Sequence, residues 1–501
     1  MMALIDSTDR YQATASLREH PGILEVNTWV WLEELSARRD EHVTLGKVAE
    51  AEWDELVPDG IDAVWLMGVW ERSPTGARVA RREPWLVDFA HSYLPDFTLD
   101  DIVGSPYSVR RYVPDDRLGG FDGLAIARDR LQARGLALLL DYVPNHLARD
   151  HPWVTEHPDF FLRGVPSDLD DHPGDFVLIG TSVFALGRDP YFPPWTDVVQ
   201  VDAFCRGFRE STVDTLAAVG EHCDGVRCDM AMLLLNDVFA RTWGERVGAP
   251  PPDDFWPSVI PAVRARHPAM TFVAEAYWDL EGVLLDQGFD YCYDKRLYDR
   301  LLERNPEGVR LHLRADPAYQ RRLVRFIENH DEPRASAVLS AGEVRAAALA
   351  VSTLPGAILY HQGQLVGKKL RVPVAVRRTP PEAEDRELAE FYARAIRTGR
   401  AVRRGDWRLC DVRAVTGDDT GRNVLAWSWE TGEGVHLIAV NLSAAPAQAW
   451  VDVPKPALEG AVVRLTDLFS SLVVEHDPGE LAGQGLYVSL PGHGFHVLTT
   501  G

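Results

Sequence analysis

Short apolar runs recur along the first four-fifths of this chain, and stretches with helical spacing separate them. Eight such runs occur, at residues 23–31, 61–68, 136–140, 225–228, 271–274, 289–293, 323–328 and 357–360. Strands that alternate with helices are typical of a parallel sheet. Eight units over roughly 400 residues match a closed (β/α)8 TIM barrel better than an open doubly wound sheet. No glycine-rich dinucleotide fingerprint follows the first run, which removes the main support for an open nucleotide-binding fold.

Three departures from this rhythm define the domain organisation. Residues 69–118 and 147–200 are rich in Pro, Asp and aromatic residues and show little periodicity, so we expect functional loops there. From Trp407 onward the apolar pattern has period 2, which predicts a small antiparallel β-sandwich. We therefore predict a catalytic barrel from residues 1–146 and 201–400, a loop-rich inserted domain at 147–200 after strand three, and a C-terminal sandwich at 401–501. A helix at 382–398 would close the barrel.

Acidic residues follow several of the predicted strands. The segment Gly225–Asp229 reads as a short strand that ends on a carboxylate, and period-2 alternation puts Arg227 and Asp229 on one face. A cation two residues before an acid would hold that acid ionised. In a TIM barrel the active site lies at the carboxyl ends of the strands. The residues that this rule brings to one mouth are Asp141, Asn145, His146, Arg227, Asp229, Glu275, His330 and Asp331.

A cluster of acids without a Cys/His metal set or a phosphate loop suits cleavage of glycosidic bonds. One carboxylate attacks or shields the cationic sugar carbon, and a second, kept protonated, donates to the leaving oxygen. Neighbouring anions should raise the pKa of that donor. Histidines at the mouth would bind sugar hydroxyls. The residue types therefore predict an enzyme that acts on a sugar.

Four segments are similar to the four conserved regions of the α-amylase family (glycoside hydrolase family 13-like), in the same order and on the same strands. They are Asp141–His146, Gly225–Asp229, Ala274–Glu275 and Asn329–Asp331. The resemblance implies that Asp229 is the nucleophile, that Glu275 is the general acid and base, and that Asp331 grips sugar hydroxyls. It further implies a retaining reaction. The substrate-binding residues that it implies are Tyr107, Asp141, His146, Arg227 and His330.

At three positions the chain differs from the family pattern, and these differences bear on the expected metal site and substrate. Met232 and Leu233 stand where many amylases carry a Lys-His pair that contributes to a calcium site, so we expect no metal there. Ser108 follows Tyr107 where many exo-acting α-glucosidases have an aspartate, which disfavours a dedicated α-glucosidase. Leu365 replaces an acid that is common after the eighth strand. No cofactor is expected.

Charge and cysteine content bear on partners and compartment. The formal net charge is -23, and this argues against nucleic acid or an anionic membrane as a partner, because phosphate binding needs basic surface. The five scattered cysteines suit free thiols in a reducing cytosol. The polar residues 1–20 lack the apolar core of a signal peptide, and no run approaches transmembrane length. We therefore expect a cytoplasmic enzyme with a small oligosaccharide or glucoside substrate.

Three functional hypotheses remain at this stage. The first is hydrolysis of α-glucosidic bonds in malto-oligosaccharides or related α-glucosides. The second is a transglycosidase that passes the same covalent intermediate to a sugar. The third is a non-catalytic carbohydrate-binding relative, which usually loses one of the three acids, whereas this chain keeps Asp229, Glu275 and Asp331.

Overall fold

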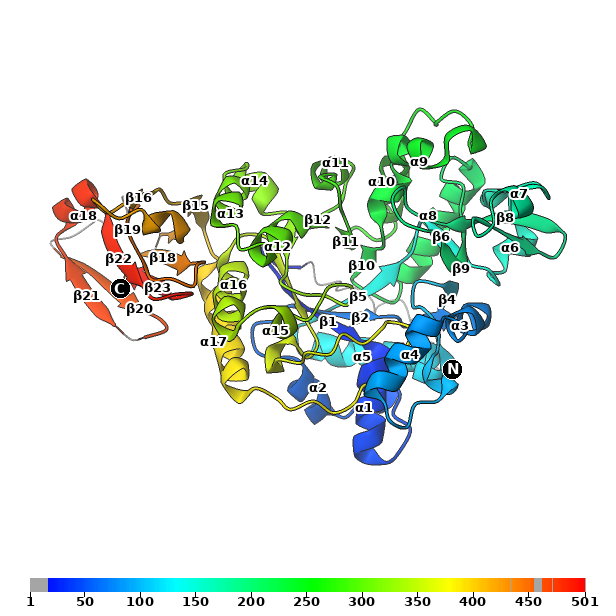
Figure 1. The fold of residues 1–501 in the computed structure, drawn as a ribbon, viewed down its shortest axis with the longest axis horizontal. Helices are drawn as coiled ribbons and strands as arrows, with labels where there is room; N and C mark the ends of the chain where they lie inside the picture. Colours follow the sequence, from blue (N-terminus) through cyan, green and yellow to red (C-terminus); the bar gives the residue numbers. More distant parts are fainter. Residues whose placement is uncertain (1–16, 433, 455–461, 471, 501) are drawn as a thin grey trace, which may run out of the picture.

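A closed barrel of eight parallel strands forms the centre of the molecule (Figure 1). The computed structural model describes residues 17–432, 434–454, 462–470 and 472–500, so most of the polar lead-in lies outside the described residues. Each barrel strand pairs with its neighbours in chain order, and β14 closes on β1, which confirms the predicted (β/α)8 barrel. The strands are β1 (Gly22–Asn27), β2 (Ala63–Met67), β5 (Ala137–Tyr142), β10 (Gly225–Cys228), β11 (Thr271–Ala274), β12 (Tyr291–Tyr293), β13 (Leu323–Arg325) and β14 (Ala357–His361).

Side chains fill the barrel interior and leave no open pore. Ile23, Trp65, Leu139, Val324 and Leu359 belong to this inner cluster, and each is at most 2% exposed. Glu25 lies two residues after Ile23 on β1 and is also fully buried. A carboxylate at an inward position of an otherwise apolar strand requires a partner, because an unpaired buried charge is costly.

Helices cover the outside of the barrel. The main covering helices are α1 (Thr28–Arg39), α2 (Glu50–Leu56), α5 (Gly120–Ala133), α8 (Arg206–Gly220), α10 (Phe255–Arg264), α12 (Lys295–Leu302), α16 (Ala341–Thr353) and α17 (Arg386–Val402). Shorter helices lie in the connections: α9 (Asn236–Trp243), α11 (Glu281–Asp286), α13 (Pro306–Leu313), α14 (Pro317–Gln320) and α15 (Ala335–Val338).

Several predicted boundaries differ from the observed ones, and two of them were wrong because a polar side chain caps a helix there. The first strand, predicted at 23–31, ends at Asn27, whose side chain accepts a hydrogen bond from the Val30 N–H and so starts α1. The closing helix, predicted at 382–398, starts after Asp385, which caps it, and runs to Val402. Residues 43–56, whose apolar spacing would suit a single helix, instead form a 3-10 turn at Leu45–Lys47 and the separate helix α2.

The section at 69–118 holds more regular structure than the sequence suggested. It contains β3 (Trp70–Arg72), α3 (Pro74–Ala80), α4 (Pro84–Tyr93) and β4 (Val109–Pro114). Pro74 and Pro84 each occupy the first turn of a helix, where a missing N–H costs nothing. Prolines that we read as loop residues therefore mark helix starts.

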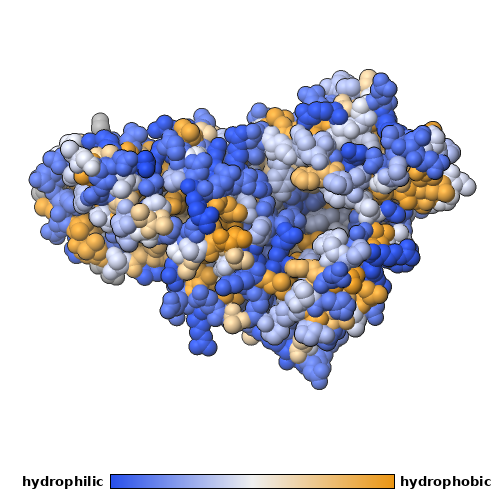
Figure 2. Space-filling view, in the orientation of Figure 1, coloured by the Kyte–Doolittle hydropathy of each residue, from blue (hydrophilic) through white to orange (hydrophobic). Residues whose placement is uncertain are grey.

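The inserted segment after the third barrel strand is likewise more ordered than predicted. It forms an antiparallel sheet in the order β6-β9-β8-β7, with β6 (His146–Ala148), β7 (Phe176–Ile179), β8 (Ser182–Gly187) and β9 (Trp195–Gln200). Two short helices, α6 (Trp153–Glu156) and α7 (Asp168–Asp171), accompany it. Figure 2 shows apolar side chains on the surface of this part of the molecule. Leu178, on the edge strand β7, is exposed.

The C-terminal part consists of two antiparallel sheets at the far end of the molecule from the insertion (Figure 1). The larger sheet holds β15 (Asp406–Leu409), β17 (Val424–Thr431), β18 (Gly434–Asn441), β23 (Phe495–Thr500), β20 (Val463–Asp467) and β21 (Val473–His476). The smaller holds β16 (Val412–Ala414), β19 (Ala447–Val451) and β22 (Leu486–Leu490), and α18 (Pro478–Gln484) precedes β22. Trp427 and Trp429 both donate to the Thr353 carbonyl of α16, which attaches this part to the barrel. Within the described ranges, no helix is both long and apolar enough to cross a membrane.

Candidate active site

A cavity of about 280 Å³ lies where the carboxyl ends of the barrel strands meet the inserted sheet. All three predicted acids line it, although they are far apart in the sequence. The inserted sheet contributes part of the wall from β9. The lining residues are Ser105, Tyr107, His146, Trp195, Asp197, Val198, Asp229, Met230, Glu275, Tyr277 and Asp331.

A single guanidinium holds two of these acids together. Strands β10 and β11 are neighbours with Cys228 opposite Ala274, so Asp229 and Glu275 leave adjacent strands at the same level. Arg227 Nη1 donates to Asp229 Oδ1 at 2.7 Å, and Arg227 Nη2 lies 2.9 Å from Glu275 Oε1. The three side chains are at most 7% exposed. The arginine therefore positions both carboxyl groups from beneath the cavity.

The environment of Glu275 favours its protonated form. Burial raises the pKa of Glu275 to about 7, with Arg227 opposing the shift and the negative charges of Asp229 and Asp331 adding to it. The Tyr277 hydroxyl donates to Glu275 Oε1 at 2.9 Å. A carboxylic acid that is half protonated near neutral pH can donate a proton and later accept one.

A strained backbone supplies another donor to Glu275. Met230 has φ 43° and ψ 44°, in the left-handed region that non-glycine residues rarely adopt. Its N–H donates to Glu275 Oε2 at 2.6 Å. Left-handed backbone costs about 1–2 kcal/mol. Because the strained residue follows Asp229 directly, the same turn aims one acid and holds the other.

Asp229 itself differs from the expectation that Arg227 simply keeps it ionised. Burial raises the pKa of Asp229 above its ordinary value, although the charge and hydrogen bond of Arg227 oppose the shift. Arg227 remains charged, because Glu275 and the other acids outweigh its own burial and raise its pKa. Arg227 therefore offsets only part of the effect of burial on the pKa of Asp229.

Asp331 belongs to a buried charge network. His330 Nε2 lies 2.9 Å from Asp331 Oδ2 and 2.7 Å from the Tyr107 hydroxyl, and His330 Nδ1 bonds to Glu25. Burial disfavours the imidazolium, but Asp331 and Glu25 outweigh it and raise the pKa of His330 well above its ordinary value. Asp331 faces the cavity with 47% of its side chain exposed. Desolvation would raise its pKa, yet His330 lowers it to about 2.

Asp141 and His146 stand at the edge of the same site. The Gly68 N–H donates to Asp141 Oδ2 at 3.0 Å from a turn with φ 78°, which suits glycine. Among the described residues, Asp141 Oδ1 is buried without a hydrogen-bond partner, and burial raises the pKa of Asp141 to about 6. Burial also lowers the pKa of His146 to about 3, so its ring is neutral. His146 lines the cavity, so its neutral ring can hydrogen-bond a ligand there, whereas Asp141 is buried and is not among the lining residues.

Four residues of the site were not identified from the sequence. Glu25 gave a signal, since it is the only carboxylate in the apolar run of the first strand. Tyr277 follows Glu275 by two residues, but nothing marked its hydroxyl as a partner. Nothing in the sequence pointed to Trp195 and Asp197. They lie on β9, a strand that was not predicted, so the side of the sheet that they face could not be predicted either.

The residues at the position of the family's calcium site are apolar in this chain. Met232 and Leu233 lie buried in a 3-10 helix, Ala231–Leu234. In the described part of the chain, no group of three or more His, Cys, Asp and Glu side chains is arranged to hold a metal ion. That the enzyme works without a metal remains a prediction.

Comparisons with known proteins point in one direction. No family model matches the chain. The α-amylase MalA of Haloarcula japonica is 24% identical over 342 residues, which are 64% of this chain and 41% of that protein. The 1,4-α-glucan branching enzyme GlgB of Myxococcus xanthus is 27% identical over 288 residues, 53% of this chain and 36% of that protein. The chain thus spans less than half the length of the curated relatives it matches.

Solved structures share the whole fold. The maltogenic α-amylase AmyB of Thermotoga neapolitana superposes with a TM-score of 0.67 at 20% identity, covering 96% of this chain and 98% of that one. The α-amylase of H. orenii gives a TM-score of 0.68 at 16% identity, covering 97% and 100%.

Proposed function

We propose that this chain, a relative of the α-amylase-family enzymes in sequence and in fold, is a retaining enzyme that cleaves α-glucosidic bonds in malto-oligosaccharides or related α-glucosides. One observation carries the proposal above the rest. A single buried arginine holds a carboxylate and a second carboxyl group with a pKa of about 7 at the wall of one cavity. Two carboxyl groups with different proton affinities are what a double-displacement reaction requires.

In the first half of the proposed reaction, Glu275 donates its proton to the leaving glycosidic oxygen. The Asp229 carboxylate attacks the anomeric carbon from the opposite face and forms a covalent glycosyl-enzyme. In the second half, the Glu275 carboxylate takes a proton from a water molecule, whose oxygen displaces Asp229. Two inversions give net retention.

The remaining residues act on the sugar that becomes cation-like. Asp331, held ionised by His330, accepts hydrogen bonds from sugar hydroxyls. The neutral His146 ring supplies a further hydrogen-bonding group at the cavity wall. Tyr107 lines the same cavity and offers an aromatic face for stacking.

Transfer to a sugar acceptor is the second candidate. The branching enzyme GlgB, and a maltosyltransferase of Burkholderia pseudomallei that is 27% identical over 186 residues (35% of this chain and 14% of that protein), are both named for transfer reactions. The same covalent intermediate serves both outcomes, and exclusion of water decides between them.

We also propose a cytosolic location. All five cysteines are free and four are buried, which suits a reducing compartment.

Chromatography of products tests the proposed function. The enzyme and its Asp229→Ala variant would each be incubated with maltose, maltoheptaose, trehalose, sucrose and soluble starch. Breakdown of one substrate by the parent alone supports hydrolysis at this site, and elongated products after addition of an acceptor sugar support transfer. Equal breakdown by both proteins would refute the assignment of Asp229.

A further inference from the structure

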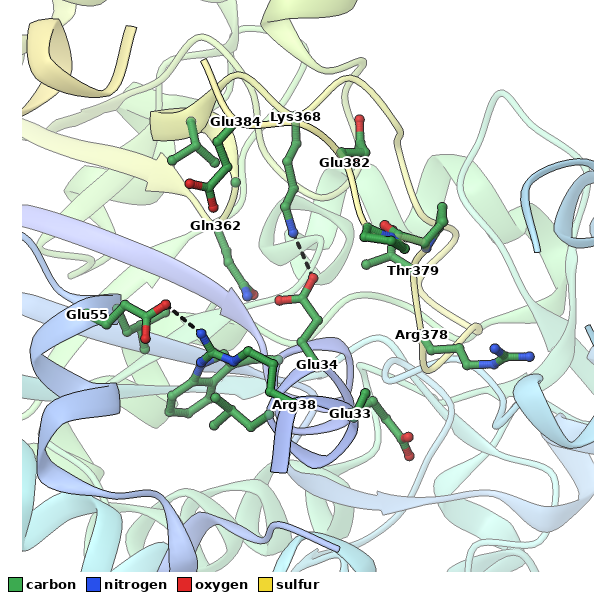
Figure 3. A pocket seen from close by; sticks show the side chains of 18 of the residues that line it. Glu33, Glu34, Arg38, Glu55, Gln362, Lys368, Arg378, Thr379, Glu382 and Glu384 are labelled. Carbon is green, nitrogen blue, oxygen red and sulfur yellow. Dashed lines mark hydrogen bonds and ion pairs between the residues drawn. The ribbon is translucent and has the colours of Figure 1, made fainter. Parts of the chain in front are cut away.

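A second and larger cavity lies between the connections that leave β1 and β14. It encloses about 800 Å³, within the range of small-molecule sites. Helices α1 and α2 form one side, and residues 362–384 form the other (Figure 3). It shares no lining residue with the catalytic cavity. A molecule bound here would therefore occupy a site of its own.

Apolar side chains line part of this cavity. They come from β1, α1 and α2 and from the segment after β14, and Trp31 is the aromatic residue among them. The apolar lining comprises Leu24, Trp31, Leu35, Leu56, Leu94, Leu365 and Val366. Leu56, Leu365 and Val366 are half-buried, so a ligand with an apolar face of C–H groups can be desolvated against them. The other four are at most 4% exposed.

Most charges around the cavity are already paired. Lys368 Nζ lies 2.7 Å from Glu34 Oε1, and Arg38 Nη1 donates to Glu55 Oε1 at 2.7 Å; both pairs appear in Figure 3. Arg378 pairs with Asp96 and Asp101, so each of the three cations in the described lining already has a carboxylate partner and none is free for an anionic ligand.

Three polar groups at the cavity are not paired. Glu382 Oε2 accepts from the Lys369 and Leu370 N–H groups, while its Oε1 is buried with no partner in the described part of the chain. The Gln362 amide is half-buried and the Glu384 carboxylate is exposed, and neither side chain forms a hydrogen bond or ion pair with described residues. Among these three groups only Glu382 has a buried atom without a partner, and because that oxygen is an acceptor, the partner it lacks is a hydrogen-bond donor.

The net charge of the cavity lining limits the chemical class of ligand that could bind. Seven carboxylates (Glu33, Glu34, Glu52, Glu55, Asp96, Glu382 and Glu384) and three cations (Arg38, Lys368 and Arg378) line the cavity. An excess of acids disfavours phosphorylated or carboxylated ligands. We propose that this cavity is a second binding site for a short neutral saccharide, with its hydroxyls on Gln362, Glu382 and Glu384 and its C–H face on the apolar lining. That the saccharide is an α-glucan fragment rests on the proposed function.

Hydrogen exchange with maltotriose separates this site from the catalytic one. The Asp229→Ala protein binds the sugar without turnover, so protection can be mapped at equilibrium. We expect slower exchange in residues 28–39 and 362–384, together with slower exchange at the active-site segments 225–234 and 274–280. Ala37→Trp, introduced into the Asp229→Ala protein, should abolish the protection at 28–39 and 362–384 and leave that at the active site. Ala37 is exposed on α1 and lines the second cavity, so a tryptophan there would occupy the cavity.

Matched variants guard against indirect effects. Ala125→Trp places the same side chain on an exposed position of α5, outside both cavities, and should leave all protection intact. Glu384→Gln keeps the shape but removes a charged acceptor, and should weaken protection at 28–39 about tenfold in midpoint concentration. Ala37→Trp in the otherwise unaltered enzyme should keep its turnover, which shows that the protein folds.

The outcomes are distinguishable. Protection at the active site alone, or protection at 28–39 that survives Ala37→Trp, would overturn the second site and leave the proposed function standing. Protection at the second cavity without any at the active site would support the second site and count against the proposed substrate. Protection by putrescine in place of maltotriose would overturn the saccharide as its ligand.

Discussion

The hydroxyl of Tyr277 controls when Glu275 can act as an acid. It donates to Glu275 Oε1 at 2.9 Å, and such a bond stabilises the carboxylate more than the acid. A hydrogen bond to a charged group contributes about 1.5–3 kcal/mol and a neutral one about 1 kcal/mol. The difference is on the order of 1.4 kcal/mol, or about one pKa unit. Tyr277→Phe should therefore raise the pKa of Glu275 from about 7 to roughly 8.

The assay is the pH dependence of kcat/KM, normalised to each protein's own maximum. Its alkaline limb reports deprotonation of the general acid in the free enzyme. At pH 8 the parent should keep roughly a tenth of its maximum and Tyr277→Phe about half, a fivefold difference in relative activity. Tyr319→Phe, which removes a hydroxyl outside the catalytic cavity, is the control. An alkaline limb that stays in place or moves to lower pH would refute the reasoning.

Four further predictions follow from the same contacts. Asp229→Ala and Glu275→Gln should each reduce turnover by at least about 10³-fold in single-turnover assays with little loss of thermal stability; retained activity would contradict their roles. Burial raises the pKa of Glu275 in the folded state above its unfolded value, so the parent loses stability as pH rises from about 4.5 through about 7. Glu275→Gln lacks this titration, so the difference in melting temperature, variant minus parent, should increase over that interval. Glu25→Gln removes one of the two anions that raise the pKa of His330, so the imidazolium should lose its proton at a lower pH than in the parent when its titration is followed by NMR; an unchanged titration would show that Glu25 does not hold the charge on His330. EDTA should leave activity intact, since Met232 and Leu233 replace polar residues at the family's calcium position, and a loss that calcium restores would contradict this.

Much of the fold could be predicted from local pattern. The strands at 225–228 and 271–274 were located to the residue, because buried parallel strands are continuous apolar runs with abrupt polar ends. Predicted boundaries were misplaced where a single polar side chain caps a helix, as Asn27 does for α1 and Asp385 for α17. The sheet in the insertion was not predicted, for a different reason. Its strands are short, and β6 pairs with β9 from the opposite end of the insertion, so their local pattern is weak.

Within the active site, the sequence by itself determined which groups come to the barrel mouth. Asp229, Glu275 and Asp331 each follow an apolar strand, and the geometry of a closed parallel barrel gathers strand ends at one face. Tertiary structure alone decided how those groups behave. The raised pKa of Glu275, the charge on His330 and the lining from Trp195 depend on burial and on contacts between residues far apart in the chain. Electrostatic energies depend on distance and dielectric environment, and only the folded protein sets both.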